Sequence, residues 1–350
     1  MSGVQLIEIT EADGGQRLDR FLKRQFAQIT QGRIEKMCRK GELRLDGGRV
    51  KASTRVKAGQ MLRVPPVPDG PAAPPSAPPS AAKLDVRDAA MIQAAVIYRD
   101  DHMIALNKPP GLPVQGGSKL TRHVDGLGPA LRFGLEEDPR LVHRLDKDTS
   151  GVLLLARSRK VASALAEAFR HKETRKIYWA LVAGVPTPYL GEIKYGLAKA
   201  GGHGPQGEGE RMIHVHPRDV DSTPGAKRAH TLYATLYRVA GRAAWVAMEP
   251  ITGRTHQLRA HMAAIGHPIA GDGKYGGSAQ ENMGDGWGAG LGGDVSRKLH
   301  LHARSLTIEH PVTGKPLTIT APLPEHMQKT WALFDWTDDL AADDPFEALF

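Results

Sequence analysis

A proline-rich segment near the front of this chain limits what the chain can fold into. Residues 65–82 read PPVPDGPAAPPSAPPSAA and contain eight prolines. Proline has a fixed φ and no backbone N–H, so such a run forms an extended spacer and cannot belong to a packed core. We therefore expect the 350 residues to divide into four parts, namely a front domain (1–66), a linker (67–90), a main domain (91–334) and an acidic tail (335–350).

Positive charge is concentrated in the front domain. The chain has a formal net charge of +9 at pH 7, and residues 1–66 hold 14 Lys and Arg against 7 Asp and Glu. Residues 335–350 hold six acids and no base. A compact basic domain favours a polyanionic partner such as nucleic acid, although a basic surface that serves only solubility has the same composition.

Cysteine content and apolar run lengths exclude several classes of protein. The single cysteine, Cys38, leaves no internal disulfide and no cysteine-rich zinc site. Acidic residues at Glu8, Glu11 and Asp13 do not fit a secretory signal peptide. The longest apolar runs, such as 152–156, are far shorter than the roughly 20 residues that span a bilayer. We expect a cytoplasmic protein without membrane contact.

Apolar residues at helical spacing predict two helices in the front domain. Gly41 is a natural end for the second helix, and Asp46-Gly47-Gly48 between alternating residues predicts a hairpin turn. The expected fold is therefore a small helix–helix–hairpin domain. The predicted apolar faces consist of Leu18, Phe21, Leu22 and Phe26 in the first helix and Ile34, Met37 and Cys38 in the second.

Both predicted helices keep a basic face. A run of charges is ordinarily a solvated surface, but here two runs flank one small core, which favours a nucleic-acid surface. The candidate RNA-binding residues of the front domain are Arg17, Arg20, Lys23, Arg33, Lys36, Arg39 and Lys40.

The main domain mixes short strands with few helices. The residue pattern predicts a strand–turn–strand unit at 95–108, an amphipathic helix at 158–170 and a strand at 176–184, and it predicts a hairpin from 230–240 and 243–251. Without a regular β-α-β rhythm, this predicts an α+β domain with a mixed, largely antiparallel sheet. Glycine-rich inserts at 200–210 and 284–293 predict surface loops.

An acidic cluster at 146–151, DKDTSG, allows three kinds of chemistry. A calcium loop is excluded because the apolar run VLLLA follows, with no further ligand. A magnesium-dependent phosphoaspartate enzyme would need more acids behind a later strand, and the downstream pairs at 338–339 and 343–344 lie in the polar tail. The favoured alternative is one activated carboxylate, Asp146, which the flanking Arg144 and Lys147 would keep ionised without a metal.

A second unusual stretch, GRTHQLRAHM at 253–262, predicts a helix with a cationic face. Thr255 is placed to cap a helix that starts near His256 and ends before Gly266. His256 and Arg259 lie three residues apart and would share a face, where the guanidinium could clamp a carboxylate. The alternative is an ordinary surface helix.

Two of these stretches together, HRLDKDTSGVLLLA (143–156) and GRTHQLRAH (253–261), strongly resemble the RluA-type family of RNA pseudouridine synthases. The front domain resembles the αL RNA-binding module of ribosome- and tRNA-handling proteins, and with VQGGSKL (114–120) it makes the chain most like the C-type large-subunit rRNA enzymes. Further similar motifs follow in the family's order, at 105–117, 175–182, 266–277 and 301–314. The linker and the insert at 284–293 depart from the family's compact pattern.

The resemblance implies an isomerase of the pseudouridine synthase fold that acts on a flipped-out nucleotide and needs neither cofactor nor metal. Asp146 would act at the ribose, either by attacking C1′ or by taking a proton from C2′. Arg259 would orient Asp146, and Tyr178 would stack on the base near the C5 proton that must leave. Leu258 would pack on the flipped base.

The resemblance also implies residues that contact the RNA. Arg144 would enter the RNA stack, with an ion pair to Asp148 as the alternative, and Asp148 itself would satisfy turn amides. Substrate contacts are expected along a phosphate path and near the base, from Lys108, His143, Lys147, Lys172, Arg175, Lys176 and His256.

Several alternatives remain open at this level. The family favours 23S rRNA or a precursor of the large ribosomal subunit as the partner, with tRNA as the second possibility. A catalytically idle RNA-binding assembly factor would keep the front domain but not need the Asp146 set. Two histidine pairs, at 214/216 and 300/302, lack a third ligand, so no metal site is expected. Nothing in the sequence suggests an obligate dimer, and we expect a monomer.

Overall fold

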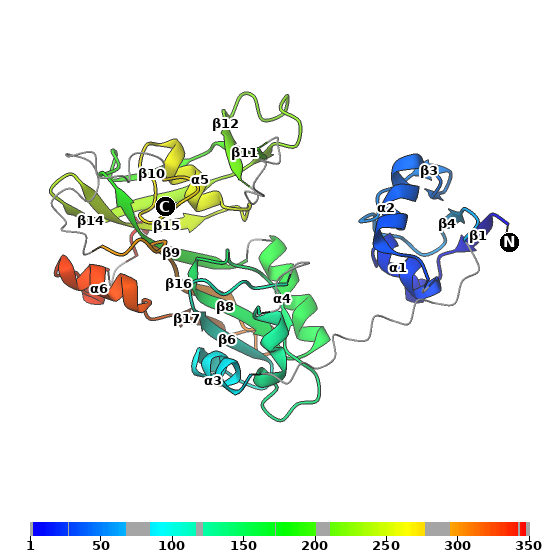
Figure 1. Cartoon of the computed structure of the whole chain (residues 1–350), viewed down its shortest axis with the longest axis horizontal. Helices are drawn as coiled ribbons and strands as arrows, with labels where there is room; N and C mark the ends of the chain where they lie inside the picture. The colour runs from blue at the N-terminus through cyan, green and yellow to red at the C-terminus, as the bar shows by residue number, and fades with distance from the viewer. Residues whose placement is uncertain are drawn as a thin grey trace. The chain divides into compact units, whose positions relative to one another are not determined.

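The structure is a computed structural model that describes residues 3–26, 28–67, 85–116, 122–171, 173–200, 211–276, 295–341 and 344–347. The chain divides into two compact units, Met1–Lys83 and Leu84–Phe350, each of which is described by itself (Figure 1). Most of the expected linker and nearly all of both glycine-rich inserts lie outside the described residues. Residues 86–90 were assigned wrongly to the linker, because they belong to helix α3 (Val86–Ala94), which Asp85 caps by accepting from the Arg87 N–H.

The front unit packs two helices, α1 (Leu18–Gln25) and α2 (Gln31–Lys40), against a small sheet. All seven predicted apolar positions of the helices are buried, so both predicted faces are confirmed. Gly41 ends α2 in the left-handed region (φ 70°), and Asp46 and Gly47 form the predicted hairpin turn with positive φ. The described sheet has four strands in the order β1-β4-β2-β3, with bounds Gln5–Glu8 (β1), Arg44–Leu45 (β2), Gly48–Arg49 (β3) and Met61–Val64 (β4).

A ten-stranded sheet runs through the described part of the main unit (Figure 1). Its order is β10-β14-β15-β9-β16-β8-β6-β5, with β17 beside β16 and β7 beside β8. Every described pairing is antiparallel except that of β16 with β8, so the predicted mixed, largely antiparallel sheet is confirmed. The bounds are Val96–Arg99 (β5), Met103–Lys108 (β6), Arg140–Leu141 (β7), Ser150–Ala156 (β8), Arg175–Ala183 (β9), Leu190–Ile193 (β10), Thr231–Val239 (β14), Ala243–Pro250 (β15), Leu301–Glu309 (β16) and Pro316–Thr320 (β17).

One row of residues across this sheet places the functional site. In register, Lys108 of β6 lies beside Gly151 of β8, Gly151 beside Ala303 of β16, and Ala303 beside Tyr178 of β9. Gly151 has φ 106°, and a Cβ there would lie 2.1 Å from the Ala303 carbonyl oxygen. Only glycine therefore fits where the two halves of the sheet meet, directly after the Asp146 loop.

Helices and a second small sheet complete the main unit. The remaining helices are α4 (Arg159–His171), α5 (Gln257–Ala264) and α6 (Glu325–Leu333), with short 3₁₀ turns at Asp125–Leu131 and Asp338–Ala341; a further 3₁₀ turn, Glu11–Asp13, lies in the front unit. The second sheet has the order β12-β11-β13, with bounds Gly196–Lys199 (β11), Met212–Val215 (β12) and Lys227–Arg228 (β13). No helix in the described ranges is long and apolar enough to span a membrane.

The acidic tail is part of the main unit's core, which corrects the expectation of a separate polar segment. Trp336 and Phe346 are buried in the cluster that holds Trp179, Trp245 and Trp331. Two acids between them make ion pairs, as Arg304 bonds to Asp338 at 2.7 Å and Arg175 to Asp344 at 2.6 and 2.7 Å. Aromatic residues among the acids supply the apolar area that fixes the segment.

Candidate active site

Asp146 lies on the loop that connects β7 to β8, at the edge of a cavity of about 180 Å³. The Thr149 N–H donates to the Asp146 carbonyl oxygen at 3.2 Å, which closes the turn. The Asp146 side chain is 24% exposed, so its carboxylate can meet a molecule in this catalytic cavity. It is the one carboxylate among the described residues that line the cavity.

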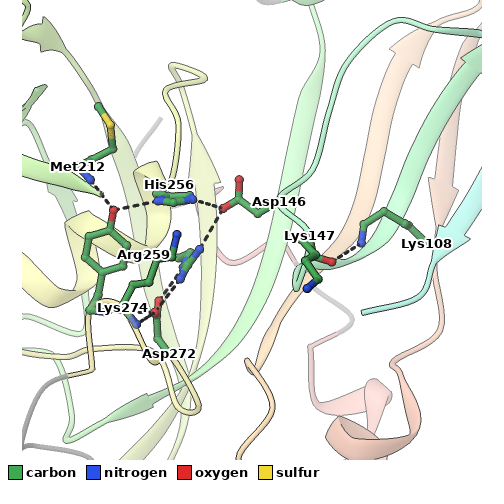
Figure 2. A network of polar contacts seen from close by, with 9 residues as sticks. Lys108, Asp146, Lys147, Met212, His256, Arg259, Asp272 and Lys274 are labelled. Atoms are coloured by element: carbon green, nitrogen blue, oxygen red, sulfur yellow. Dashed lines mark hydrogen bonds and ion pairs between the residues drawn. The ribbon is translucent and has the colours of Figure 1, made fainter. Parts of the chain in front are cut away.

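Arg259 connects Asp146 to a second, buried carboxylate (Figure 2). Its Nε and Nη2 donate to the two oxygens of Asp272, each at 2.7 Å, and the Asp272 side chain has no exposed surface. Its third nitrogen, Nη1, lies 3.5 Å from Asp146 Oδ2. Burial alone would lower the pKa of Arg259, but hydrogen bonds to Asp272 and the charges of Asp272 and Asp146 raise it. A permanent cation therefore faces Asp146 in a fixed orientation.

His256 faces Asp146 from the same side and is held by Tyr275 (Figure 2). The Tyr275 hydroxyl accepts the Met212 N–H at 2.8 Å and lies 3.0 Å from His256 Nδ1. Burial lowers the pKa of His256, and the charge of Asp146 opposes this only in part. The ring is therefore neutral at pH 7, with Nδ1 held at the Tyr275 hydroxyl and Nε2 directed toward Asp146 Oδ2, 3.8 Å away.

Tyr178 and apolar side chains form the wall of the catalytic cavity. Tyr178 is half-buried on β9, and burial followed by the charge of Asp146 raises its pKa well above the usual value. Its phenol is therefore neutral and offers a flat face and an O–H. Leu258, Leu301 and Leu145 are buried and line the same cavity. The predicted set of Asp146, Tyr178, Arg259, Leu258 and His256 thus meets in one place.

Arg144 is exposed and lines the catalytic cavity, and among the described residues it makes no ion pair with Asp148. Asp148 is exposed and lines a neighbouring cavity, and the turn that it was expected to cap is closed through Thr149. Lys147 is exposed, and Lys176 is half-buried with its ammonium 5.8 Å from the Phe169 ring centre. Arg144 and Lys147 therefore present their charges to solvent. Lys172 lies outside the described residues.

The prediction of a phosphate contact was wrong for Lys108. Its side chain is fully buried, and its ammonium donates to the carbonyls of Pro109, Leu112 and Lys147 at 2.9, 3.0 and 2.9 Å. Burial lowers its pKa to about 7. Lys108 therefore holds the loop after β6 against the residue that follows Asp146 (Figure 2).

Two further residues of the predicted phosphate path have other partners. His143 Nε2 accepts the Leu154 N–H at 2.8 Å, its ring stacks on Phe169, and burial followed by the charge of Lys176 lowers its pKa to about 3. His143 is therefore neutral at physiological pH. Arg175 binds Glu249 and the tail residue Asp344, so its guanidinium is occupied within the protein.

The start of α5 differs from the prediction of a Thr255 cap. His256 occupies the cap position in the left-handed region (φ 51°), and its side chain makes no capping bond. Instead, the Gln257 side chain turns back and accepts the Arg254 N–H at 3.0 Å. This unusual backbone conformation directs His256 toward Asp146 while Arg259 remains one turn away on the helix.

Asp272 and Tyr275 are the residues that sequence reasoning missed. Both belong to the motif GHPIAGDGKYGG (266–277), whose resemblance to the family implied no role for either residue. An aspartate that follows a glycine in a motif rich in turns could have been flagged, but nothing in one sequence shows that it faces Arg259. The Met212 N–H, from β12, also bonds Tyr275. The sequence could not predict this contact, because almost every residue carries the same backbone donor.

The histidine pairs lie within the protein's own hydrogen bonding. His300 lies within hydrogen-bond distance of the Lys298 carbonyl and the Thr330 hydroxyl, and His302 of the Ser150 hydroxyl and the Ala321 carbonyl. His214 lies against the ring of Tyr195. Within the described ranges, no three acidic, histidine or cysteine side chains form a group that could hold a metal ion.

The seven candidate residues of the front unit are all exposed. Arg17 pairs with Asp19 at 2.5 Å, and Lys40 lies 3.8 Å from Glu42. The other five make no ion pair among the described residues. They are Arg20, Lys23, Arg33, Lys36 and Arg39.

Comparison with known proteins agrees with this geometry. Residues 102–264 match the RNA pseudouridylate synthase family, and residues 16–62 match the S4 domain. The ribosomal large subunit pseudouridine synthase C of Vibrio vulnificus (strain CMCP6) is 37% identical over 330 residues, 93% of this chain and 95% of that protein. Its counterpart in Escherichia coli (strain K12) is 36% identical over 331 residues, again 93% and 95%.

A solved structure gives the same result for the main unit. Human RNA pseudouridylate synthase domain containing 4 aligns with a TM-score of 0.55 and 28% identity, covering 71% of this chain and 95% of that chain. The family resemblance inferred from the Asp146 and Arg259 motifs is confirmed. This chain belongs to the RNA pseudouridylate synthase family and carries an S4 domain at its front.

Proposed function

We propose that this protein converts particular uridines of large-subunit ribosomal RNA into pseudouridine, and that Asp146 is the carboxylate that reacts. In this isomerisation the N1–C1′ bond breaks, the base turns and C5 bonds to C1′, while C5 loses a proton and N1 gains one. No electron is transferred and no atom is lost. The observation that carries the proposal is that Asp146, the one carboxylate among the described residues lining the cavity, faces a fixed guanidinium.

The other residues of the cavity fit supporting roles. Arg259 stabilises the ionised form of Asp146 and orients it toward the ribose. Tyr178, as a neutral phenol, stacks on the base near C5, and Leu258 packs on the opposite apolar wall. Attack of Asp146 at C1′ and removal of the C2′ proton both begin from this arrangement.

The target base must leave its stack to enter the cavity, which costs a few kcal/mol. Arg144, exposed at the cavity edge, fills the space that the base leaves. The front unit holds the RNA through its exposed cations, chiefly by phosphate contacts. Large-subunit rRNA is the substrate because relatives over 93% of the chain are named for it. We propose that the enzyme acts as a monomer in the cytoplasm.

The test is to incubate the purified protein with unmodified transcripts of 23S rRNA and of tRNA and to map pseudouridine at single-nucleotide resolution. We expect product in 23S rRNA, and none with Asp146→Asn although RNA binding persists. Pseudouridine in tRNA alone would show that tRNA, and not 23S rRNA, is the substrate. Binding without product in either RNA would favour an assembly factor, and phosphatase activity abolished by EDTA would favour the metal-dependent alternative.

A second experiment tests the front unit in the full chain. Arg20→Gln, Lys23→Gln and Lys36→Gln together remove three exposed charges, and Lys160→Gln, Lys227→Gln and Lys315→Gln remove three exposed charges of the main unit as a control. We expect the front variant alone to bind RNA less tightly, with a smaller slope of log Kd against log salt. Equal slopes in the two variants would show that the front unit does not contact RNA phosphates.

A further inference from the structure

A second cavity lies beside the catalytic cavity. Its volume is about 410 Å³, and Arg259 lines both this cavity and the catalytic cavity. Three exposed cations line it, namely Lys274, Arg297 and Lys298. None of the three makes an ion pair with another residue in the described ranges. We call this space the basic cavity.

The loops that carry these cations are fixed by backbone contacts. Gly271 has φ 74°, and a Cβ there would lie 2.0 Å from the Lys298 carbonyl oxygen, so the two loops touch where only glycine fits. The His300 N–H donates to the Ala270 carbonyl at 2.9 Å and joins the same loops again. The backbone positions of Lys274 and Lys298 are thus fixed by contacts between their loops.

Asp272 connects the basic cavity to the catalytic machinery. The carboxylate that binds Arg259 also accepts the N–H groups of Lys274 and Tyr275 through Oδ1, at 3.0 and 3.2 Å (Figure 2). One buried side chain therefore sets both the direction of the arginine that faces Asp146 and the position of the loop that carries Lys274.

Charge defines the chemical class of the ligand. Among the described lining residues, Asp148 is the one acid, and the charge of Arg259 is offset by Asp272. Three uncompensated cations around one hollow favour an anion with several oxygens, and phosphate is the usual partner of lysine and arginine at nucleic-acid sites. Because Arg259 lines both cavities, a nucleotide whose base entered the catalytic cavity would have a neighbouring phosphate within reach of the basic cavity.

We propose that the basic cavity binds one backbone phosphate next to the flipped nucleotide, through Lys274, Arg297 and Lys298. The proposal rests on the proposed function, because the phosphate belongs to the RNA whose uridine reacts at Asp146. Binding at this point adds affinity and fixes the register of the strand, so that one nucleotide alone reaches the catalytic cavity.

The experiment uses the full-length protein and a short RNA centred on a uridine that the wild-type chain modifies. A single uncharged methylphosphonate replaces each phosphate in turn on both sides of that uridine. Each modified linkage follows a 2′-deoxynucleotide, and the same deoxy RNA with normal phosphates is the reference. The proteins compared are wild type, Lys298→Ala, Arg297→Ala and, as the matched surface control, Lys315→Ala.

We expect one methylphosphonate position to raise the KM of wild type and of Lys315→Ala. Lys298→Ala and Arg297→Ala should raise KM for the normal RNA, lower the salt slope by about 0.7 to 0.9, and show no further loss at that one position. Turnover at saturating RNA should be retained. Thermal unfolding of the variants checks that they remain folded.

The outcomes separate the two proposals. If the variants and wild type lose equally at every methylphosphonate position, the basic cavity does not hold a phosphate, although the enzyme still makes pseudouridine. If wild type makes no pseudouridine on any RNA, the proposed function fails first. A loss of turnover with unchanged KM would assign these cations to the reaction and overturn the binding role.

Discussion

Two buried basic side chains, Arg259 and Lys108, flank the Asp146 loop, and they differ in their partners and in the direction of their pKa shifts (Figure 2). The Arg259 side chain is 7% exposed and pairs with the carboxylates of Asp272 and Asp146, and its pKa is raised. Lys108 is fully buried and binds three backbone carbonyls, and burial lowers its pKa to about 7, with the charges of Asp148 and Asp146 opposing only part of the shift.

This difference shows that the two cations serve the loop in different ways: Arg259 supplies charge to the Asp146 carboxylate, and Lys108 fixes the loop backbone. On the Arg259 side Asp146, the carboxylate that we propose reacts, needs a lasting opposite charge, and the buried carboxylate of Asp272 holds the Arg259 cation in place. On the Lys108 side the loop needs only directed N–H donors, which tie Pro109 and Leu112 to the Lys147 carbonyl. A buried ammonium without a carboxylate is costly, so loss of its proton near neutral pH relieves part of that cost.

The largest effect is expected from Asp146→Asn, which removes the negative charge that Arg259 faces. Asp146→Asn should lower the rate of pseudouridine formation by at least about 10³-fold, because no ionised carboxylate remains beside the ribose. The free energy of unfolding should change by less than about 1 kcal/mol, since Asp146 is partly exposed. Single-turnover kinetics and chemical denaturation measure the two quantities, and Asp101→Asn, an exposed acid that lines neither the catalytic cavity nor the basic cavity, is the control. Normal turnover in Asp146→Asn would exclude Asp146 as the reacting group.

The next effect breaks the buried half of the arginine pair. Asp272→Asn leaves the Arg259 charge without its buried partner and should cost roughly 3 to 5 kcal/mol of stability, along with much of the turnover. Asp338→Asn is the matched control, because Asp338 also bonds an arginine at 2.7 Å but is 54% exposed. Because solvent screens the exposed Asp338 carboxylate, its pair with Arg304 should contribute at most about 1 kcal/mol. Equal losses in denaturant midpoint would show that burial does not distinguish the two pairs.

Lys108→Met tests the other cation through its pH dependence. The folded protein releases the Lys108 proton near pH 7, whereas an unfolded lysine keeps its proton to about pH 10.5. Between these values the unfolded state holds more protons, so wild-type stability should rise with pH relative to the variant, by up to about 1.4 kcal/mol per pH unit. Below pH 7 the difference should be constant. Urea titrations from pH 6 to 10 measure it, and a flat difference throughout would mean that the three carbonyls keep Lys108 protonated.

The fold was predictable from the sequence where the pattern was local. Burial of Leu18, Phe21 and Leu22 followed from helical spacing, and the hairpin from β14 to β15 followed from two alternating runs. The front sheet's β1 was not predicted, because the apolar Leu6 occupies a 68% exposed position and so hides in the sequence the alternation that burial follows. The packed tail was hidden because its acids outnumber the two aromatic residues that fix it.

The site was predictable in its chemistry but not in its supports. Motif resemblance brought together Asp146, Tyr178 and Arg259, and the geometry agrees. Lys108 was misjudged because one sequence cannot show whether a lysine at the end of a strand faces solvent or three carbonyls. The support from Asp272 depends on a contact across 13 residues that neither helical nor strand periodicity describes.

The smallest expected effect concerns the third polar group on the Arg259 side. Tyr275→Phe removes the hydroxyl that holds His256 Nδ1 and leaves the Met212 N–H without its acceptor, which should cost about 1 to 2 kcal/mol. The freed imidazole no longer points one nitrogen at Asp146, so kcat should fall several-fold while KM for RNA stays the same.

Tyr98→Phe is the matched control for this variant. It removes a hydroxyl that donates to Asp100 at 2.6 Å, and both residues lie outside the catalytic cavity. It should lose similar stability and keep its kcat. If both variants lose stability and neither loses kcat, His256 is only a packing residue, and Arg259 alone supplies the polar contact that holds Asp146 in place on that side.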